Sequence, residues 1–170
     1  MRFLFVGDVH AKLTDLEECS ALLGKVRDTV QAAKPDLTVF LGDQHHNHSV
    51  VRVEVMDFWR KSFSALEGPV LALVGNHDKG PGHDAHAMDA YQGLKNSSGK
   101  ELIIVSSPTL LDGVLFLPHM DRAAFTIACQ LNASVPFAVA HQAFDGSKYE
   151  SGFFAEDGVK PSECPQKTFV

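Results

Sequence analysis

Polar residues of the types that bind metal ions follow four apolar runs of this sequence, each directly after the run ends. These residues are, in chain order, Asp8 and His10, Asp43, Asn76, and His141. Carboxylate, amide and imidazole groups are donors with which proteins hold divalent cations. In open α/β sheets, ligands bind just beyond the carboxyl ends of the strands, so residues far apart in sequence meet at one place. The pattern therefore predicts a metal-dependent hydrolase.

The apolar runs are typical of strands buried in a sheet, and segments with helical periodicity alternate with them. The strand-like runs span residues 2–6, 37–41, 70–74, 102–105, 114–117 and 137–140. Residues 16–30 and 51–66 place their apolar side chains at helical spacing. This alternation predicts an α/β fold. Because the sequence contains no repeats and no low-complexity linker, we expect one domain spanning residues 1–170.

Local signals predict where the helices begin. The pattern Thr14-Asp15-Leu16-Glu17 matches a capping box at the start of the first helix. Ser49 is the predicted cap of the second helix and Asp121 that of a third, and a short helix is expected at 84–91. Residues 141–167 show little periodicity, although they contain several aromatic side chains. We expect this segment to be either a partly packed lid beside the site or an ordinary surface loop.

Composition restricts the classes of function. Of the 170 residues, 45% are hydrophobic and 21% are charged, which is typical of a globular protein. The formal net charge of −6 argues against a broad nucleic-acid interface, which needs clustered Lys and Arg. An anionic substrate is still compatible with this balance, because bound cations reverse the local field.

The cysteines and the N-terminal segment indicate the compartment. Cys19, Cys129 and Cys164 are odd in number and form no C-x-x-C pair, which favours free thiols in a reducing cytosol. The N-terminal segment lacks the roughly 7–15-residue apolar region of an export signal. No run approaches the ~20 apolar residues of a membrane span. We therefore expect a cytoplasmic protein without a membrane segment.

Two-metal hydrolysis of a phosphate ester gives each of the polar residues a role. Such ions lie roughly 3.5–4 Å apart and need a ligand that contacts both, and Asp43, in the middle of the series, suits that position. We expect Asp8 and His10 to bind one ion and Asn76 and His141 the other. The positive site attracts phosphate and lowers the pKa of a shared water, giving hydroxide at neutral pH. Mixed nitrogen and oxygen ligands favour manganese, iron or zinc.

His77 lies beside an expected ligand and is better suited to catalysis than to metal binding. We expect its ring to stabilise the transition state and to protonate the leaving oxygen, with Asp78 orienting the ring; such acid catalysis contributes about 10²–10⁴-fold. Taken singly, Asp8 and Asp43 also fit a role as turn residues after glycine, and His141 fits a structural histidine. The functional interpretation depends on their joint occurrence at four strand ends.

The motifs together resemble the signature of the calcineurin-like metallophosphoesterase superfamily. They are, in order, Asp8-x-His10, Gly42-Asp43, Gly75-Asn76-His77-Asp78 and His141. The resemblance spans nearly the whole chain, and Gly-Asn-His-Asp is its most specific part. It implies an αββα sandwich, a dinuclear metal centre, and His77 as the catalytic histidine. The implied ligands are Asp8, His10 and Asp43 for one ion, and Asp43, Asn76 and His141 for the other.

Two further features are similar to particular branches of this superfamily. His46, three residues after the bridging position, and His141-Gln142 make the chain similar to the SbcD-type DNA repair nucleases. His46 is therefore a candidate second substrate-side histidine, and the alternative is an exposed loop histidine beside His45 and His48. Residues 141–149 are also similar to phage-encoded members, which implies the host cytoplasm as the location.

One element of the family pattern is missing. The pattern ends with Gly-His-x-His, which gives one histidine to each ion, and this sequence contains no such element. The chain stops at Thr168-Phe169-Val170, which is typical of the opening of the strand that should carry it. We expect a truncated chain with three protein ligands per ion and with reduced metal affinity and activity. His119 is a minor candidate for a replacement ligand.

Three hypotheses follow from these patterns. The first is a metal-dependent phosphoesterase acting on a phosphomonoester or a phosphodiester. The second is a DNA repair exonuclease or endonuclease of the SbcD type, which His46 favours and the acidic net charge disfavours. The third is a catalytically silent scaffold that binds a partner, against which the presence of His77 and Asp78 argues.

Overall fold

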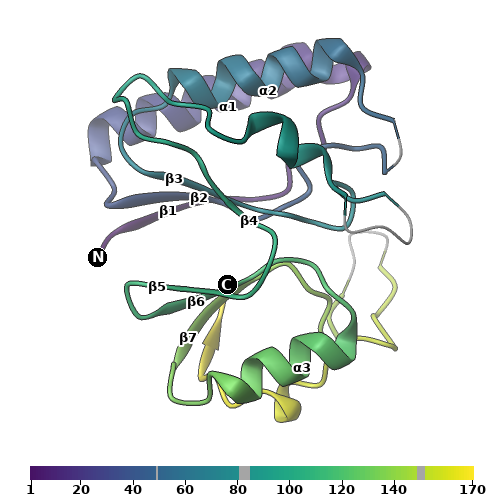
Figure 1. The fold of residues 1–170 in the computed structure, drawn as a ribbon. Coiled ribbons are helices and arrows are strands. Elements are labelled where there is room, and N and C mark those ends of the chain that lie inside the picture. The colour runs from purple at the N-terminus through teal and green to yellow at the C-terminus, as the bar shows by residue number, and fades with distance from the viewer. Residues whose placement is uncertain (49, 81–84, 149–151) are drawn as a thin grey trace. The chain divides into compact units, whose positions relative to one another are not determined.

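Parallel strand pairing organises both parts of the chain, each of which combines one sheet with helices (Figure 1). The computed structural model describes residues 1–48, 50–80, 85–148 and 152–170. It forms two compact units, Met1–Ile104 and Val105–Val170. Two sheets rich in parallel pairs, combined with helices, confirm the predicted α/β fold class. The prediction of one domain stays a prediction beside this division.

The first unit contains a four-stranded sheet in the order β1-β2-β3-β4. Its strands are β1 (Phe3–Val6), β2 (Leu37–Phe40), β3 (Val70–Leu73) and, at the boundary between the units, β4 (Ile103–Val105). β1 pairs with β2 in parallel, with Val6 opposite Phe40. β2 pairs with β3 in parallel, with Phe40 opposite Ala72. The first three strands consequently end at the same edge, which brings together the loops that follow them.

Two amphipathic helices, α1 (Leu16–Ala33) and α2 (Val53–Ala65), lie side by side over this sheet (Figure 1). Each helix buries residues three or four positions apart, the spacing that places side chains on one helix face. The buried residues are Cys19, Leu23, Val26 and Val30 in α1 and Val55, Trp59 and Phe63 in α2. A 3₁₀ turn, η1 (Leu13–Asp15), precedes α1, and a second one, η2 (Ala87–Tyr91), follows β3.

Aromatic packing ties α2 to the sheet. Phe40 of β2 packs edge-on against Trp59 and Phe63, with ring centroids 5.9 and 5.2 Å apart, and all three side chains are buried. Trp59 also donates a hydrogen bond from Nε1 to the carbonyl oxygen of Gln44, 3.0 Å away. A buried indole N–H needs such a partner. This bond connects α2 to the loop that follows β2.

The second unit contains a four-stranded sheet in the order β5-β6-β7-β8 and the helix α3 (Arg122–Leu131). Its strands are β5 (Thr109–Leu111), β6 (Val114–Leu117), β7 (Phe137–Ala140) and β8 (Thr168–Phe169). β5 and β6 form an antiparallel hairpin through Asp112 and Gly113, which both have the positive φ that tight hairpin turns require. β7 pairs in parallel with both β6 and β8. A 3₁₀ turn, η3 (Pro161–Glu163), precedes β8.

The irregular segment after β7 packs in part against the second unit's core. Phe125 of α3 is fully buried and its ring centroid lies 6.0 Å from that of Phe144. Val159 is also fully buried, whereas Phe153 and Phe154 are 75% and 60% exposed. The segment is therefore partly packed, and its role as a lid stays a prediction.

The helix starts differ from the sequence prediction in one case. α1 begins at Leu16, after η1, and Asp15 accepts a hydrogen bond from the backbone N–H of Lys12 at 2.9 Å. The predicted capping box starting at Thr14 is therefore wrong. Asp121 caps α3 as predicted, because its Oδ1 accepts from the N–H of Ala124 at 3.0 Å.

The other two predicted helix starts, Ser49 and residue 84, lie outside the described residues. The second helix begins at Val53, and the predicted short helix corresponds to the 3₁₀ turn η2. All three cysteines are buried free thiols, as predicted. None of the helices in the described ranges is both long and apolar enough to cross a bilayer.

Candidate metal and catalytic site

Backbone hydrogen bonds join the loop after β1 to the loop after β2. The N–H of His10 donates to the carbonyl oxygen of Asp43 at 2.9 Å, and the N–H of Ala11 donates to that of Gln44 at 3.0 Å. The N–H of His46 donates in turn to the carbonyl oxygen of Ala11 at 3.3 Å. This short ladder extends the pairing of the two strands beyond their ends. The predicted ligands in the two loops are therefore held in a fixed register.

His10 and Asp43 both adopt left-handed backbone conformations, with φ of 49° and 52°. Most residues other than glycine avoid this region, although aspartate and histidine enter it more often than other side chains. Outliers of this kind cost about 1–3 kcal/mol each and cluster at functional sites. Gly42, directly before Asp43, has a φ of 111°, which glycine adopts without such a cost. The fold thus holds two of the predicted metal ligands in a backbone conformation that few non-glycine residues adopt.

The loop after β3 approaches Asp43 so closely that only glycine fits at one position. A Cβ atom on Gly75 would overlap the backbone nitrogen and Oδ1 of Asp43. The N–H of His77 donates a hydrogen bond to the same Oδ1 at 2.8 Å. Asp43 is only 4% exposed. Its carboxylate is therefore placed by the loops after β1, β2 and β3 together.

The carboxylate of Asp78 is fully buried and faces the loop after β2. Its Oδ1 accepts from the N–H of His45 at 3.0 Å and from Nδ1 of the His45 ring at 2.8 Å, and its Oδ2 accepts from the N–H of Gly75 at 2.9 Å. The ring of His77 has another partner, since its Nδ1 lies 2.6 Å from the carbonyl oxygen of His46. The prediction that Asp78 orients the His77 ring is therefore wrong.

His45 is a buried residue of this site whose role the sequence does not reveal. Its Nε2 lies 3.0 Å from the hydroxyl oxygen of Tyr91, so the ring connects Asp78 to η2. Burial, and secondarily Asp78, raises the pKa of Tyr91, so its hydroxyl keeps its proton. His45 stands in a run with His46 and His48, and no feature of the sequence identifies which of the three is buried.

One group of side chains has the spacing of a metal site. Asp8, His10 and Asp43 offer ligand atoms that all lie within 4.8 Å of one another. Nε2 of His10 lies 3.4 Å from Oδ2 of Asp43. Two atoms that are each about 2.1 Å from one tetrahedral ion lie roughly 3.4 Å apart. Nδ1 of His10 is buried without a hydrogen-bond partner among the residues that the structure describes. The donor set and its spacing fit a divalent cation.

A histidine cluster adjoins this group. His10, His46 and His77 bring ring nitrogens within 4.8 Å of one another. The ring centroid of His77 lies 4.6 Å from that of His10 and 5.9 Å from that of His46. The exposed ring of His48 packs on His77 at 3.9 Å, and its Nδ1 lies 3.0 Å from the carbonyl oxygen of Asn76. His77 is therefore fixed by its neighbours next to the ligand group, and His48 is a contact that sequence patterns do not predict.

The remaining predicted ligands belong to different units. Asn76 is partly buried in the loop after β3 of the first unit. His141 belongs to the second unit, directly after β7, and its N–H donates to the carbonyl oxygen of Leu117 at 3.0 Å. Its ring centroid lies 6.3 Å from that of His119, which follows β6. The assignment of Asn76 and His141 to a second ion stays a prediction, as does a ligand role for His119.

The sequence model of the calcineurin-like phosphoesterase family matches residues 1–155. The chain belongs to the calcineurin-like phosphoesterase family. Membership makes it a hydrolase acting on phosphoric ester bonds, in a family that generally uses a dinuclear centre of divalent metals. No curated protein matches the chain significantly.

Two solved structures are similar to this phosphoesterase at low sequence identity. A novel archaeal phosphodiesterase has 15% identity and a TM-score of 0.49, and the match covers 94% of this chain and 80% of the other. The Pseudomonas putida nuclease MPE has 20% identity and a TM-score of 0.47, with coverage of 96% and 75%. Because these identities and TM-scores are low, the assignment to the family rests on the match of the family's sequence model and not on these two structures.

Replacing Gly75 by alanine should weaken metal binding, because the new Cβ must displace the Asp43 carboxylate. We expect the Kd for Mn²⁺ to rise by roughly 10–100-fold, the range typical of changes that shift a ligand. Isothermal titration calorimetry on the folded variant measures this. Gly80→Ala is the matched control, because a Cβ there meets no atom within 4 Å. Equal affinities of the two variants would contradict the proposed role of the close contact.

Burial lowers the pKa of His10 below its ordinary value of 6.5; Asp43 opposes the shift, and the His77 ring adds to it. The unfolded chain therefore binds more protons at His10, and the stability provided by the neutral ring is present above about pH 6.5 and lost as the pH falls through the lowered pKa. NMR titration of the metal-free protein should place this His10 midpoint below 6.5. The free energy of unfolding, measured with urea, should fall less for His10→Gln than for the unaltered protein when the pH is lowered from about 7 to about 5. Identical pH dependence of the two proteins would contradict the prediction.

Proposed function

We propose that this chain hydrolyses a phosphomonoester or phosphodiester with the help of two divalent ions, manganese first, with iron or zinc as alternatives. The proposal rests on one observation, the convergence of the ligand group Asp8, His10 and Asp43 with the ring of His77. Carboxylate and imidazole donors without thiolate suit these metals.

In the proposed centre, Asp43 would be the ligand shared by the two ions. Asp8 and His10 would complete the ligand set of one ion, and Asn76 and His141 that of the other. The position of Asp43 supports the bridging role, because Oδ2 lies near His10 while Oδ1 faces the loop that carries Asn76. Divalent ions at this place supply positive charge for the phosphate oxygens and make water a better nucleophile.

His77 is proposed as the general acid. Because the carbonyl oxygen of His46 can only accept, Nδ1 of His77 is the nitrogen that carries a proton toward it. Nε2 is then the atom that serves the substrate. In the hydrolytic step, a water molecule loses one proton to the solvent, its oxygen bonds to phosphorus, and the ester P–O bond breaks with its electron pair on the leaving oxygen. The Nε2 proton of the cationic ring passes to that oxygen.

Two other predicted residues receive supporting roles. His46 is exposed, with its ring centroid 5.9 Å from those of both His10 and His77, and we propose it as the second substrate-side histidine. Asp78 is proposed as a positioning residue, because it accepts hydrogen bonds from the two loops that carry Asp43 and His77.

The His77→Ala variant should lose turnover of 4-nitrophenyl phosphate esters with Mn²⁺ by about 10²–10⁴-fold, because the leaving oxygen no longer receives a proton. Its metal content, measured by mass spectrometry after gel filtration, should equal that of the unaltered protein. His48→Ala is the comparison variant: it removes the imidazole that packs on His77 but leaves the acid itself in place, so it should cause a much smaller loss. Full activity of His77→Ala would exclude the proposed general acid.

The alternative is a DNA exonuclease or endonuclease, which the exposed position of His46 beside the site favours. The net charge of −6 disfavours long nucleic-acid contacts. Incubation of a labelled oligonucleotide with the protein and Mn²⁺ separates the two functions. If the chain is a nuclease, cleavage should occur and His46→Ala should reduce it more than it reduces aryl ester turnover. If no cleavage occurs with any divalent metal, the nuclease alternative is excluded.

A further inference from the structure

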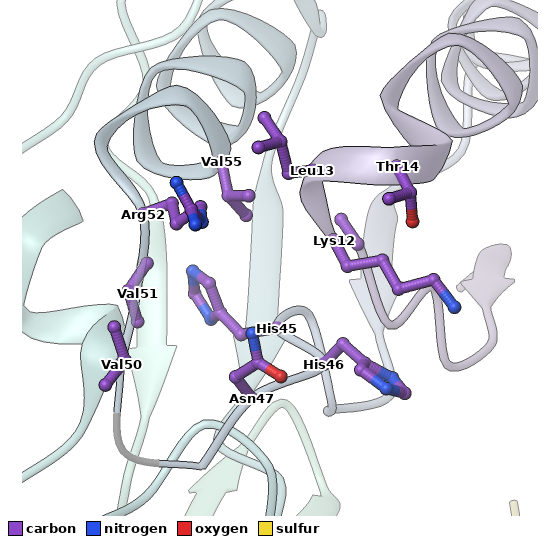
Figure 2. Close-up of a pocket in the computed structure, with 11 residues that line it drawn as sticks. Lys12, Leu13, Thr14, His45, His46, Asn47, Val50, Val51, Arg52 and Val55 are labelled. Carbon is purple, nitrogen blue, oxygen red and sulfur yellow. The ribbon is translucent and has the colours of Figure 1, made fainter.

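We propose that a pocket beside His46 binds the organic part of the substrate, and that this part is a single nucleoside carrying a second phosphate. The inference rests on the proposed function, because it assigns a substrate class to the same site. The pocket has a volume of about 240 Å³ and lies between the start of α1 and the segment that leads into α2 (Figure 2).

The pocket shares a wall with the candidate catalytic group. His46 lines the pocket and also belongs to the cluster with His10 and His77. Ala11, which follows His10 directly, lines it as well. The pocket is therefore next to the group at which we place the phosphate of the ester.

The pocket walls are largely apolar. Figure 2 shows Val50 and Val51 on one side, with Leu13 and Val55 near the two helix starts. Val50 is 67% exposed and Leu13 is 42% exposed. Exposed apolar side chains that gather around a hollow next to a polar site mark a ligand-binding surface. They suit the face of an aromatic ring better than a sugar or a polar peptide.

Two cationic side chains border the same pocket in an acidic protein. Lys12 and Arg52 both line it. Lys12 pairs with Asp15 at 3.7 Å, whereas Arg52 has no carboxylate partner among the residues that the structure describes. A guanidinium left without an acidic partner is suited to binding phosphate oxygens. The pocket therefore offers a site for a second anionic group next to the ring.

The size of the pocket limits the substituent. Pockets for drug-sized ligands span about 300–1,000 Å³, and this one, at about 240 Å³, holds one ring system. An aromatic ring with one anion at the reacting position and another nearby describes a nucleoside bisphosphate. A phosphotyrosine side chain supplies the ring but only one phosphate, and therefore fits the pocket less well.

Direct binding tests this inference. Calorimetry with Mn²⁺-loaded protein should show adenosine 5′-monophosphate binding about tenfold more tightly than ribose 5-phosphate, which has the same phosphate and no base. Adenosine 3′,5′-bisphosphate should bind more tightly than the monophosphate. Phosphotyrosine should bind more weakly than the bisphosphate, because it offers Arg52 no second phosphate.

Two pairs of variants locate the contacts. Val50→Ser replaces two methyl groups by a hydroxyl at a partly exposed position, and should reduce the preference for the monophosphate over ribose 5-phosphate about fourfold, the loss expected when roughly one CH₂ equivalent of apolar contact disappears. Val53→Ser is its control, because Val53 is 77% exposed and does not line the pocket. Arg52→Gln should remove the gain from the second phosphate, whereas Arg27→Gln, at an exposed position on α1, should leave it intact.

The outcomes separate this inference from the proposed function. Equal binding of adenosine 5′-monophosphate and ribose 5-phosphate, or no binding of either, would overturn the nucleotide pocket. The nucleotide pocket would also be overturned if phosphotyrosine bound more tightly than adenosine 3′,5′-bisphosphate. The same holds if Val50→Ser and Val53→Ser changed the preference for the monophosphate equally. An absence of aryl ester hydrolysis alone would contradict the proposed function, and the calorimetry would still decide the ligand.

Discussion

The buried carboxylate of Asp78 is the interaction on which the geometry of this site depends. It accepts hydrogen bonds from the N–H groups of His45 and Gly75, and so joins the loop after β2 to the loop after β3. Hydrogen bonds to a charged group contribute about 1.5–3 kcal/mol each, and a buried carboxylate that loses its partners is strongly destabilising. The carboxylate thus connects the loop that carries Asp43, with its positive φ, to the loop that carries Gly75, where a Cβ would overlap Asp43.

The strands and the edge that carries the ligands are predictable from the sequence, because long apolar runs end at polar residues and parallel strands end together. Asp8, His10 and Asp43 therefore meet as the pattern suggests. The partner of Asp78 is not predictable. An aspartate next to a histidine suggests a pair, but the hydrogen bond runs to His45, across two loops that meet only in the folded chain. Strand β5 is too short to show a pattern.

In the proposed function, the first unit separates the residues that carry out the chemistry from those that select the substrate. The ligand group and His77 are held by backbone hydrogen bonds between the loops and by the bond from His77 N–H to the buried Asp43 carboxylate. Gly75 approaches Asp43 too closely for a Cβ atom, so substitutions are poorly tolerated here. The pocket next to them is made of partly exposed side chains on the segments that lead into two helices. Such segments vary without disturbing the core. A family that shares one catalytic arrangement can in this way serve many different esters.

The contact of Trp59 with the carbonyl oxygen of Gln44 also has a practical consequence. Trp59 is the one tryptophan of the sequence, it is fully buried, and the carbonyl that it contacts belongs to the residue after Asp43. Indole emission depends on the surroundings of that ring. The chain therefore carries an intrinsic fluorophore at the base of its ligand loop, and ordering of that loop can be followed optically without any label.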